Sequence, residues 1–102
     1  WGRIVTAAGY SGAPINPQTL SLTIAGQAKA RKPNAKAPAG VCVFKQGVPA
    51  KLSTTQNRRL QAAMQQKEVF FSLDLGQGQA AANWLGCDLS REYIRINADY
   101  TT

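Results

Sequence analysis

Residues Thr19 to Ile24 read TLSLTI, a stretch in which apolar and hydroxyl residues alternate at every step. In an extended segment, Leu20, Leu22 and Ile24 therefore share one face, and the Thr and Ser side chains share the other. This period of two is typical of a β-strand that is buried on one face only. The stretch predicts such a strand, and the sequence on either side supplies the other elements of a small core.

Two further regions predict strands. Val41 to Phe44 is a short, continuous apolar run, which suits a buried strand. From Glu68 to Leu75 the apolar residues again fall on one face, at Val69, Phe71, Leu73 and Leu75. Gly76 to Gly78 then predicts a turn into another apolar run, Ala80 to Leu85, so that these two segments form a hairpin.

Two helices are predicted in the first two thirds of the chain. Trp1 to Ala8 has apolar residues at the spacing of one helical face, and Gly9 with the Gly12, Pro14 cluster is expected to end this helix. Ser53 and Gln56 have the spacing of a capping box, in which each side chain accepts a hydrogen bond from the other residue's backbone N–H. They predict a helix over Thr54 to Gln66, with inward residues Leu60, Ala63 and Met64.

A third helix is predicted near the end of the chain, capped by Asp88 or Ser90, with Leu89, Tyr93 and Ile96 at helical spacing. The predicted order is helix, strand, strand, helix, strand, strand, helix. This order indicates an α+β fold, a mixed sheet with helices on one face, as in an α/β roll or a two-layer sandwich. A length of 102 residues and a hydrophobic content of 44% are enough for one domain with a modest core.

The formal net charge of +7 is unevenly distributed along the chain. Residues 1–67 hold ten Lys or Arg and no acidic residue, whereas residues 68–102 hold two basic and five acidic residues. Residues 26–40 (GQAKARKPNAKAPAG) contain four of the basic residues and little to bury, which predicts a basic flexible loop. Such asymmetry indicates contact with nucleic acid or with an acidic surface that this chain does not contain.

The residue types exclude several kinds of site. The chain has no histidine, and Cys42 and Cys87 form no CxxC pair, so neither a metal site nor a histidine-dependent catalytic triad is expected. No cofactor is expected either. Both cysteines stand beside apolar residues and are expected to be buried and reduced. No apolar run is long enough to span a membrane and no secretory signal is recognisable, so a cytoplasmic protein is expected.

Three motifs near the end of the chain resemble one enzyme family. They are Leu73 to Gly78 (LDLGQG), Gly86 to Leu89 (GCDL) and Tyr93 to Thr102 (YIRINADYTT). Together they look like the closing segments of the ornithine acetyltransferases, also called glutamate N-acetyltransferases (ArgJ). Trp1 to Ala8 (WGRIVTAA) is similar to the motif that begins the C-terminal region of this family. The resemblance is weakest between Ala25 and Gln66, which include the basic loop.

The resemblance implies that residues 1–102 are a single C-terminal domain of a larger, processed enzyme, at the end of its β chain. Such enzymes transfer acetyl from N-acetylornithine to glutamate in arginine biosynthesis, and some also use acetyl-CoA. Their precursor cuts itself at an Ala-Thr bond, and the new N-terminal Thr is the nucleophile, with its own α-amine as a base. This chain lies after that point. By this resemblance it is inactive alone and belongs to a hetero-oligomer with the remainder of the α and β chains.

The resemblance also supplies candidate site residues. Asn97 and Thr102, in the NADYTT ending, match family residues that bind the amino-acid substrate, N-acetylornithine or glutamate. An amide can hydrogen-bond a polar group of the substrate, and a terminal Thr can offer a hydroxyl and a carboxylate to its ammonium group. No catalytic residue is expected in this chain.

Two other interpretations remain open. In a basic nucleic-acid-binding module, phosphates would be neutralised by Lys29, Arg31, Lys32 and Lys36, and Trp84 or Phe70 would stack on bases. This is less favoured, because aromatic residues in strand-like runs usually fill core positions. A protein-interaction domain of ubiquitin-like shape also fits the predicted elements, but a fold alone does not establish a function.

Overall fold

A computed structural model of the chain describes residues 1–27 and 38–100. Its three α-helices in these ranges are α1 (Gly2–Tyr10), α2 (Thr54–Met64) and α3 (Arg91–Asp99). The strands are β1 (Ser21–Gln27), β2 (Val41–Lys45), β3 (Val48–Pro49) and β4 (Glu68–Asp74), and a 3₁₀ turn, η1 (Pro17–Thr19), precedes β1. The predicted α+β class is confirmed.

The four strands form one sheet in the order β3-β2-β1-β4. We expected a mixed sheet, and all three pairings among the described strands are antiparallel. The strand predicted from TLSLTI is at the centre: β1 pairs with β4 along seven residues and with β2 on its other side. Its start lies slightly later than predicted, because Thr19 belongs to the 3₁₀ turn.

The core lies on the face of the sheet that presents Leu22 and Ile24, which are 0% and 2% exposed. Val41 and Val43 of β2 complete the buried cluster. The register between β1 and β2 shifts between Leu22 and Thr23, so that an extra residue of β2 is accommodated there. Such a bulge turns neighbouring side chains toward the same face. Accordingly, both Val43 and its neighbour Phe44 pack on the core side.

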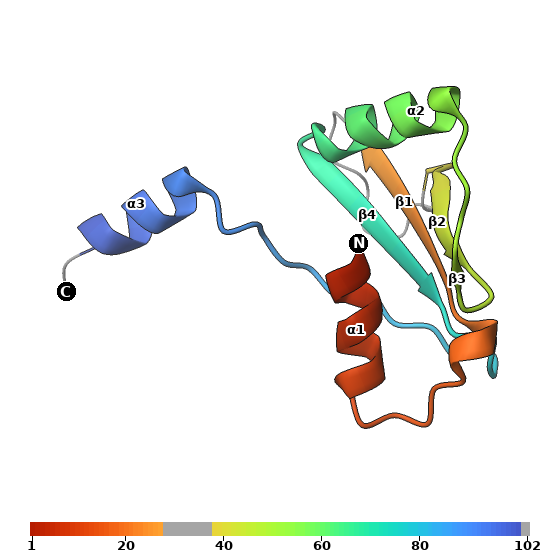
Figure 1. Cartoon of the computed structure of the whole chain (residues 1–102). Helices are drawn as coiled ribbons and strands as arrows, with labels where there is room; N and C mark the ends of the chain where they lie inside the picture. The colour runs from red at the N-terminus through yellow and green to blue at the C-terminus, as the bar shows by residue number, and fades with distance from the viewer. Residues whose placement is uncertain (28–37, 101–102) are drawn as a thin grey trace.

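Helices α1 and α2 cover this face. Ile4 and Val5 of α1 and Leu60 of α2 pack against the buried cluster. Figure 1 shows α1 and α2 beside the sheet, while α3 stands apart from it at the end of a long connection. The predicted arrangement of helices on one face therefore holds for α1 and α2, but not for α3.

Several local predictions are confirmed and others need correction. The capping box of α2 is present, with Ser53 N donating to Gln56 Oε1 at 2.9 Å and Gln56 N donating to Ser53 Oγ at 3.2 Å. Met64, predicted to face inward, is 50% exposed. Helix α1 ends at Tyr10, within the predicted region between Gly9 and the Gly12, Pro14 cluster, but it continues past Gly9 itself. A glycine inside a helix lowers its stability but removes no hydrogen-bonding group, so one glycine alone does not stop it.

The predicted hairpin after β4 is wrong. Residues 80–90 contain neither helix nor strand, and Trp84 and Leu85 are 96% and 93% exposed. The hairpin in this sheet is instead β2–β3, which the sequence analysis did not predict. Its two turn residues, Gln46 and Gly47, have φ angles of 49° and 84°. Two positive φ angles are typical of the type I′ turn that joins short antiparallel strands.

The two cysteines also differ from expectation. Both are free thiols, but Cys87 is exposed and Cys42 is only partly buried. The Cys42 thiol lies 3.3 Å from the Phe44 carbonyl oxygen, to which it donates a hydrogen bond. Burial of Cys87 was predicted from its apolar neighbours, and those neighbours are themselves exposed.

Candidate functional site

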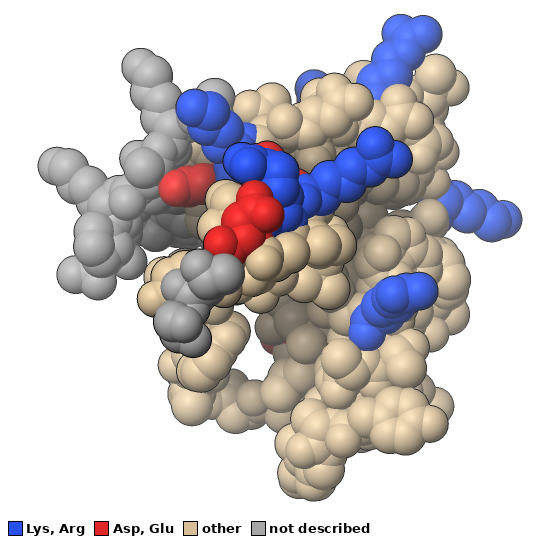
Figure 2. Space-filling view, turned by 90° about the vertical axis from the view of Figure 1, so that its left-hand side faces the viewer, with Lys and Arg blue, Asp and Glu red and all other residues tan. Residues whose placement is uncertain are grey.

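The last described element, α3, is a helix with a side-chain N-cap and a charged face. Ser90 caps it, since its Oγ accepts a hydrogen bond from Tyr93 N at 3.1 Å. Arg95 pairs with Glu92 at 2.6 Å and with Asp99 at 3.5 Å. The hydrogen bond from Arg95 holds the pKa of Glu92 below its usual value, and the pKa of Arg95 is raised by the same contact. Figure 2 shows acidic and basic side chains side by side on this face of the molecule.

The other face of α3 is apolar and exposed. Tyr93, Ile96 and Tyr100 are 38%, 55% and 76% exposed. Together with Trp84 and Leu85 on the connection, they leave much of the apolar surface of residues 79–100 in contact with solvent. Groups of large exposed apolar side chains mark surfaces that bind other proteins. This tail, as we call residues 79–100, therefore has the character of an interaction segment.

Asn97 lies on α3 beside the apolar face. Its Nδ2 donates a hydrogen bond to Tyr93 O, one helical turn earlier, at 2.8 Å. Its Oδ1 accepts no hydrogen bond from any residue that the structure describes, and the side chain is exposed. A free amide oxygen of this kind can accept a hydrogen bond from an ammonium or amide N–H group. Thr102, the second predicted site residue, lies outside the described residues.

The LDLGQG motif connects the end of β4 to the segment between α1 and β1. The Gln77 side chain makes two hydrogen bonds there: Oε1 accepts from Asn16 N at 3.3 Å, and Nε2 donates to Pro14 O at 3.2 Å. Thr19 Oγ1 donates to Leu75 O at 2.6 Å. The sequence predicted a hairpin turn at Gly76 to Gly78, and the role of Gln77 was not predicted. Asp74 is a local signal for the turn itself, because its carboxylate accepts a hydrogen bond from Gly76 N at 2.8 Å, as Asp does in tight turns.

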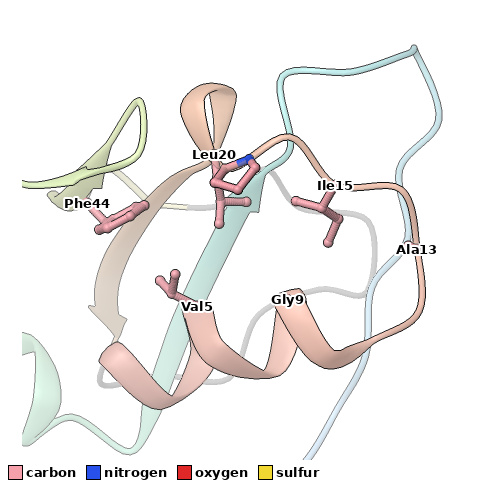
Figure 3. A pocket seen from close by; sticks show the side chains of 7 residues that line it. Val5, Gly9, Ala13, Ile15, Leu20 and Phe44 are labelled. Atoms are coloured by element: carbon pink, nitrogen blue, oxygen red, sulfur yellow. The ribbon is translucent and has the colours of Figure 1, made fainter.

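An apolar hollow of about 330 Å³ lies between α1 and the start of β1. Figure 3 shows Val5, Leu20 and Phe44 pointing into it, with Ile15 at its other end. Among the described residues, no charged side chain or hydroxyl lines the hollow, and acid–base or nucleophilic chemistry requires such groups. A second hollow of about 380 Å³, between α2 and the sheet, has Arg59 as its charged lining residue.

The structure describes the aromatic residues of the nucleic-acid interpretation but not its basic residues. Lys29, Arg31, Lys32 and Lys36, with residues 28–37 of the predicted basic loop, lie outside the described residues. Trp84 is on the exposed connection, and Phe70 is partly buried in β4. Trp84 is thus not the core residue that the sequence predicted.

Across residues 1–27 and 38–100, no group of three or more Cys, Asp or Glu side chains is arranged to hold a metal ion. In the same ranges, no helix is long and apolar enough to cross a membrane. The fold and these surfaces define a small α+β domain with an exposed helical tail, without a catalytic cluster among its described residues.

This chain belongs to the ArgJ family, whose model matches residues 1–102. The glutamate N-acetyltransferase of Methanothermobacter thermautotrophicus is 37% identical over 103 residues, which cover 100% of this chain and 23% of that protein. That of Methanosarcina mazei is 38% identical over 103 residues, with the same shares covered. The arginine biosynthesis bifunctional protein ArgJ of Deinococcus radiodurans is 36% identical over 105 residues, covering 100% of this chain and 22% of that protein.

The chain thus spans less than a quarter of the length of these curated relatives. No solved structure gives a significant match.

Proposed function

We propose that residues 1–102 are the C-terminal domain of the β chain of an arginine-biosynthesis acetyltransferase, which moves acetyl from N-acetylornithine to glutamate. The match of the ArgJ family model to all 102 residues carries this proposal. The names of the relatives support it further, since they are glutamate N-acetyltransferases or ArgJ proteins of arginine biosynthesis.

In the reaction that we propose for the whole enzyme, an N-terminal Thr outside this chain attacks the acetyl carbonyl of N-acetylornithine. The carbon–nitrogen bond breaks, ornithine leaves with a proton on its amine, and the Thr oxygen holds the acetyl group as an ester. The amine of glutamate then attacks this ester, loses a proton and restores the Thr hydroxyl. Acetyl-CoA, as another acetyl donor, would acetylate the same Thr. The α-amine of the Thr can serve as the base.

Within this scheme, the chain contributes substrate contacts and no nucleophile. Asn97 is the candidate that the structure describes, because its Oδ1 is exposed and accepts no hydrogen bond from the described residues. We propose that this oxygen accepts a hydrogen bond from an ammonium group of the amino-acid substrate. Thr102 would add its hydroxyl at the same place.

The remainder of the α and β chains is the proposed partner, in a hetero-oligomer in the cytoplasm, with self-cleavage of the precursor. The exposed apolar side chains of the tail support a partner of this kind. In isolation the chain is expected to have no acetyltransferase activity.

The test uses the full-length enzyme that contains this chain, with Asn97→Ala. We expect KM for N-acetylornithine to rise roughly tenfold, as for the loss of a hydrogen bond to a charged group. Self-cleavage should be unaffected. Alanine favours a helix more than asparagine does, so unwinding of α3 would not explain the change.

Asn57→Ala is the matched control, because Asn57 is an exposed asparagine on α2 and lies on a different part of the domain. It should leave KM unchanged. Removal of residues 97–102 should abolish transfer while self-cleavage continues. An unchanged KM in Asn97→Ala, together with full activity of the truncated enzyme, would show that this region is only a scaffold.

A further inference from the structure

The turn from which the tail leaves the domain has a specific hydrogen bond and a position that only glycine can occupy. Asp74 accepts a hydrogen bond from Gly76 N at 2.8 Å, and Gly76 has a φ angle of 64°. A Cβ atom at Gly76 would lie 2.7 Å from the Cβ of Thr19, so only glycine fits both the conformation and the space. The chain turns here against the segment that leads into β1.

Gln77 then joins two backbone groups with one side chain. Its Oε1 accepts from Asn16 N at 3.3 Å and its Nε2 donates to Pro14 O at 3.2 Å. The amide is planar, so two hydrogen bonds to groups two residues apart set its orientation as well as its position. We call these two hydrogen bonds the Gln77 clamp.

Beyond the clamp, the tail has no other polar attachment. Among the described residues, no hydrogen bond or ion pair joins residues 79–100 to residues 1–78, and those of α3 are all within α3 or to its cap. Residues 79–90 contain no regular structure. The direction in which the tail leaves the domain is therefore set at Gln77.

We propose that Gln77 is a positioning residue, which holds the base of the tail so that Asn97 reaches the substrate in the whole enzyme. This inference rests on the proposed function for Asn97. Both hydrogen bonds of the clamp are exposed, so their loss changes global stability little. Their loss does free the base of a long segment, and a displaced Asn97 side chain would make a poorer contact with the substrate, so substrate binding weakens.

The test compares Gln77→Leu with Gln79→Leu in the full-length enzyme. Leucine keeps the approximate size of glutamine and removes both hydrogen bonds. Gln79 is exposed and has no hydrogen bond among the described residues, so it is the matched control. We expect Gln77→Leu to raise KM for N-acetylornithine roughly fivefold with little change in kcat, because a positioning error acts on binding. Gln79→Leu should change neither.

A double variant separates positioning from simple loss of structure. If Gln77 acts through Asn97, adding Gln77→Leu to Asn97→Ala should raise KM little further. Equal multiplication of the two effects would overturn the inference. Gln77→Glu keeps the acceptor for Asn16 N and loses the donor to Pro14 O, so it should fall between wild type and Gln77→Leu. It serves as the test if Gln77→Leu does not fold.

Amide hydrogen exchange in the same enzymes tests the Gln77 clamp whether or not Asn97 binds the substrate. In Gln77→Leu, the amide of Asn16 should exchange faster than in Gln79→Leu, because it loses its acceptor, Gln77 Oε1. If Asn97→Ala leaves KM unchanged, the proposed substrate contact fails. Faster exchange would then still support the clamp, whereas unchanged exchange would overturn it in every case.

Discussion

Gly26 lies where α2 comes nearest to β1. A Cβ atom at this position would collide with Ala63 O and would lie 2.6 Å from Ala63 Cα. Its φ angle is not in the left-handed region, so this glycine is needed for space and not for its conformation. Without a side chain at this position, α2 can pack directly against the backbone of β1.

We predict that Gly26→Ala lowers the free energy of unfolding by about 1–3 kcal/mol, because overpacking forces α2 away from the sheet. Urea denaturation of the chain would measure this. Gly9→Ala is the control: nothing lies within 4 Å of its added Cβ, and a helical Ala is more stable than Gly. A Gly26→Ala protein as stable as wild type would contradict the close packing.

At single residues, the sequence predicted burial correctly within the periodic strand pattern and incorrectly outside it. Leu20, Leu22 and Ile24 are buried as their alternation indicates. Cys87 and Trp84 were expected in the core and are exposed, because residue type alone does not show whether a neighbouring element covers a side chain. Gln77 could not be found from the sequence, since its partners lie 61 and 63 residues away along the chain.

Among the secondary-structure elements, those with complete local signals were predicted well. The start of α2 is specified by Ser53 and Gln56 alone, and β2 is specified by its continuous apolar run. The strand predicted over Ala80 to Leu85 does not form. Half of that run is alanine, which has a low preference for strands, and an apolar run indicates burial without showing against what. The short β3 has only two residues, too few for a periodic pattern.

We predict that Ser53→Ala destabilises the chain by about 1 kcal/mol, because the Gln56 N–H at the start of α2 loses its acceptor. Thermal or urea unfolding would measure this difference. Thr55→Ala is suited as a comparison, since Thr55 is exposed in the first turn of the same helix and alanine suits a helix better. It should be neutral or slightly stabilising. Equal losses in both variants would mean that the cap contributes nothing of its own.

The whole molecule consists of two parts with different character. Residues 1–27 and 38–78 form a packed domain, whereas the tail presents Trp84, Leu85 and the apolar face of α3 to solvent. The charge follows a similar division, since residues 1–67 contain no acid and all five acidic residues come later. The family motifs pointed to Asn97 in the tail, but the local sequence pattern does not show what its side chain contacts.

We predict that Trp84 is strongly quenched by acrylamide in the 102-residue chain, because its side chain is 96% exposed. In the full-length enzyme, the same residue should be protected if the tail docks on the remaining chain. Fluorescence would be recorded in a Trp1→Phe background, since Trp1 also emits and is 47% exposed. Equal quenching in both proteins would show that the tail stays in solvent.

The two-residue β3, with Pro49 at its end, has a consequence for association between copies of the sheet. An edge strand offers a row of backbone N–H and C=O groups to which another chain can add. A strand this short offers almost none, and proline has no N–H to donate. Growth of the sheet by pairing with β3 is therefore disfavoured, and β4, with seven residues, is the longer of the two edge strands to which another strand could add.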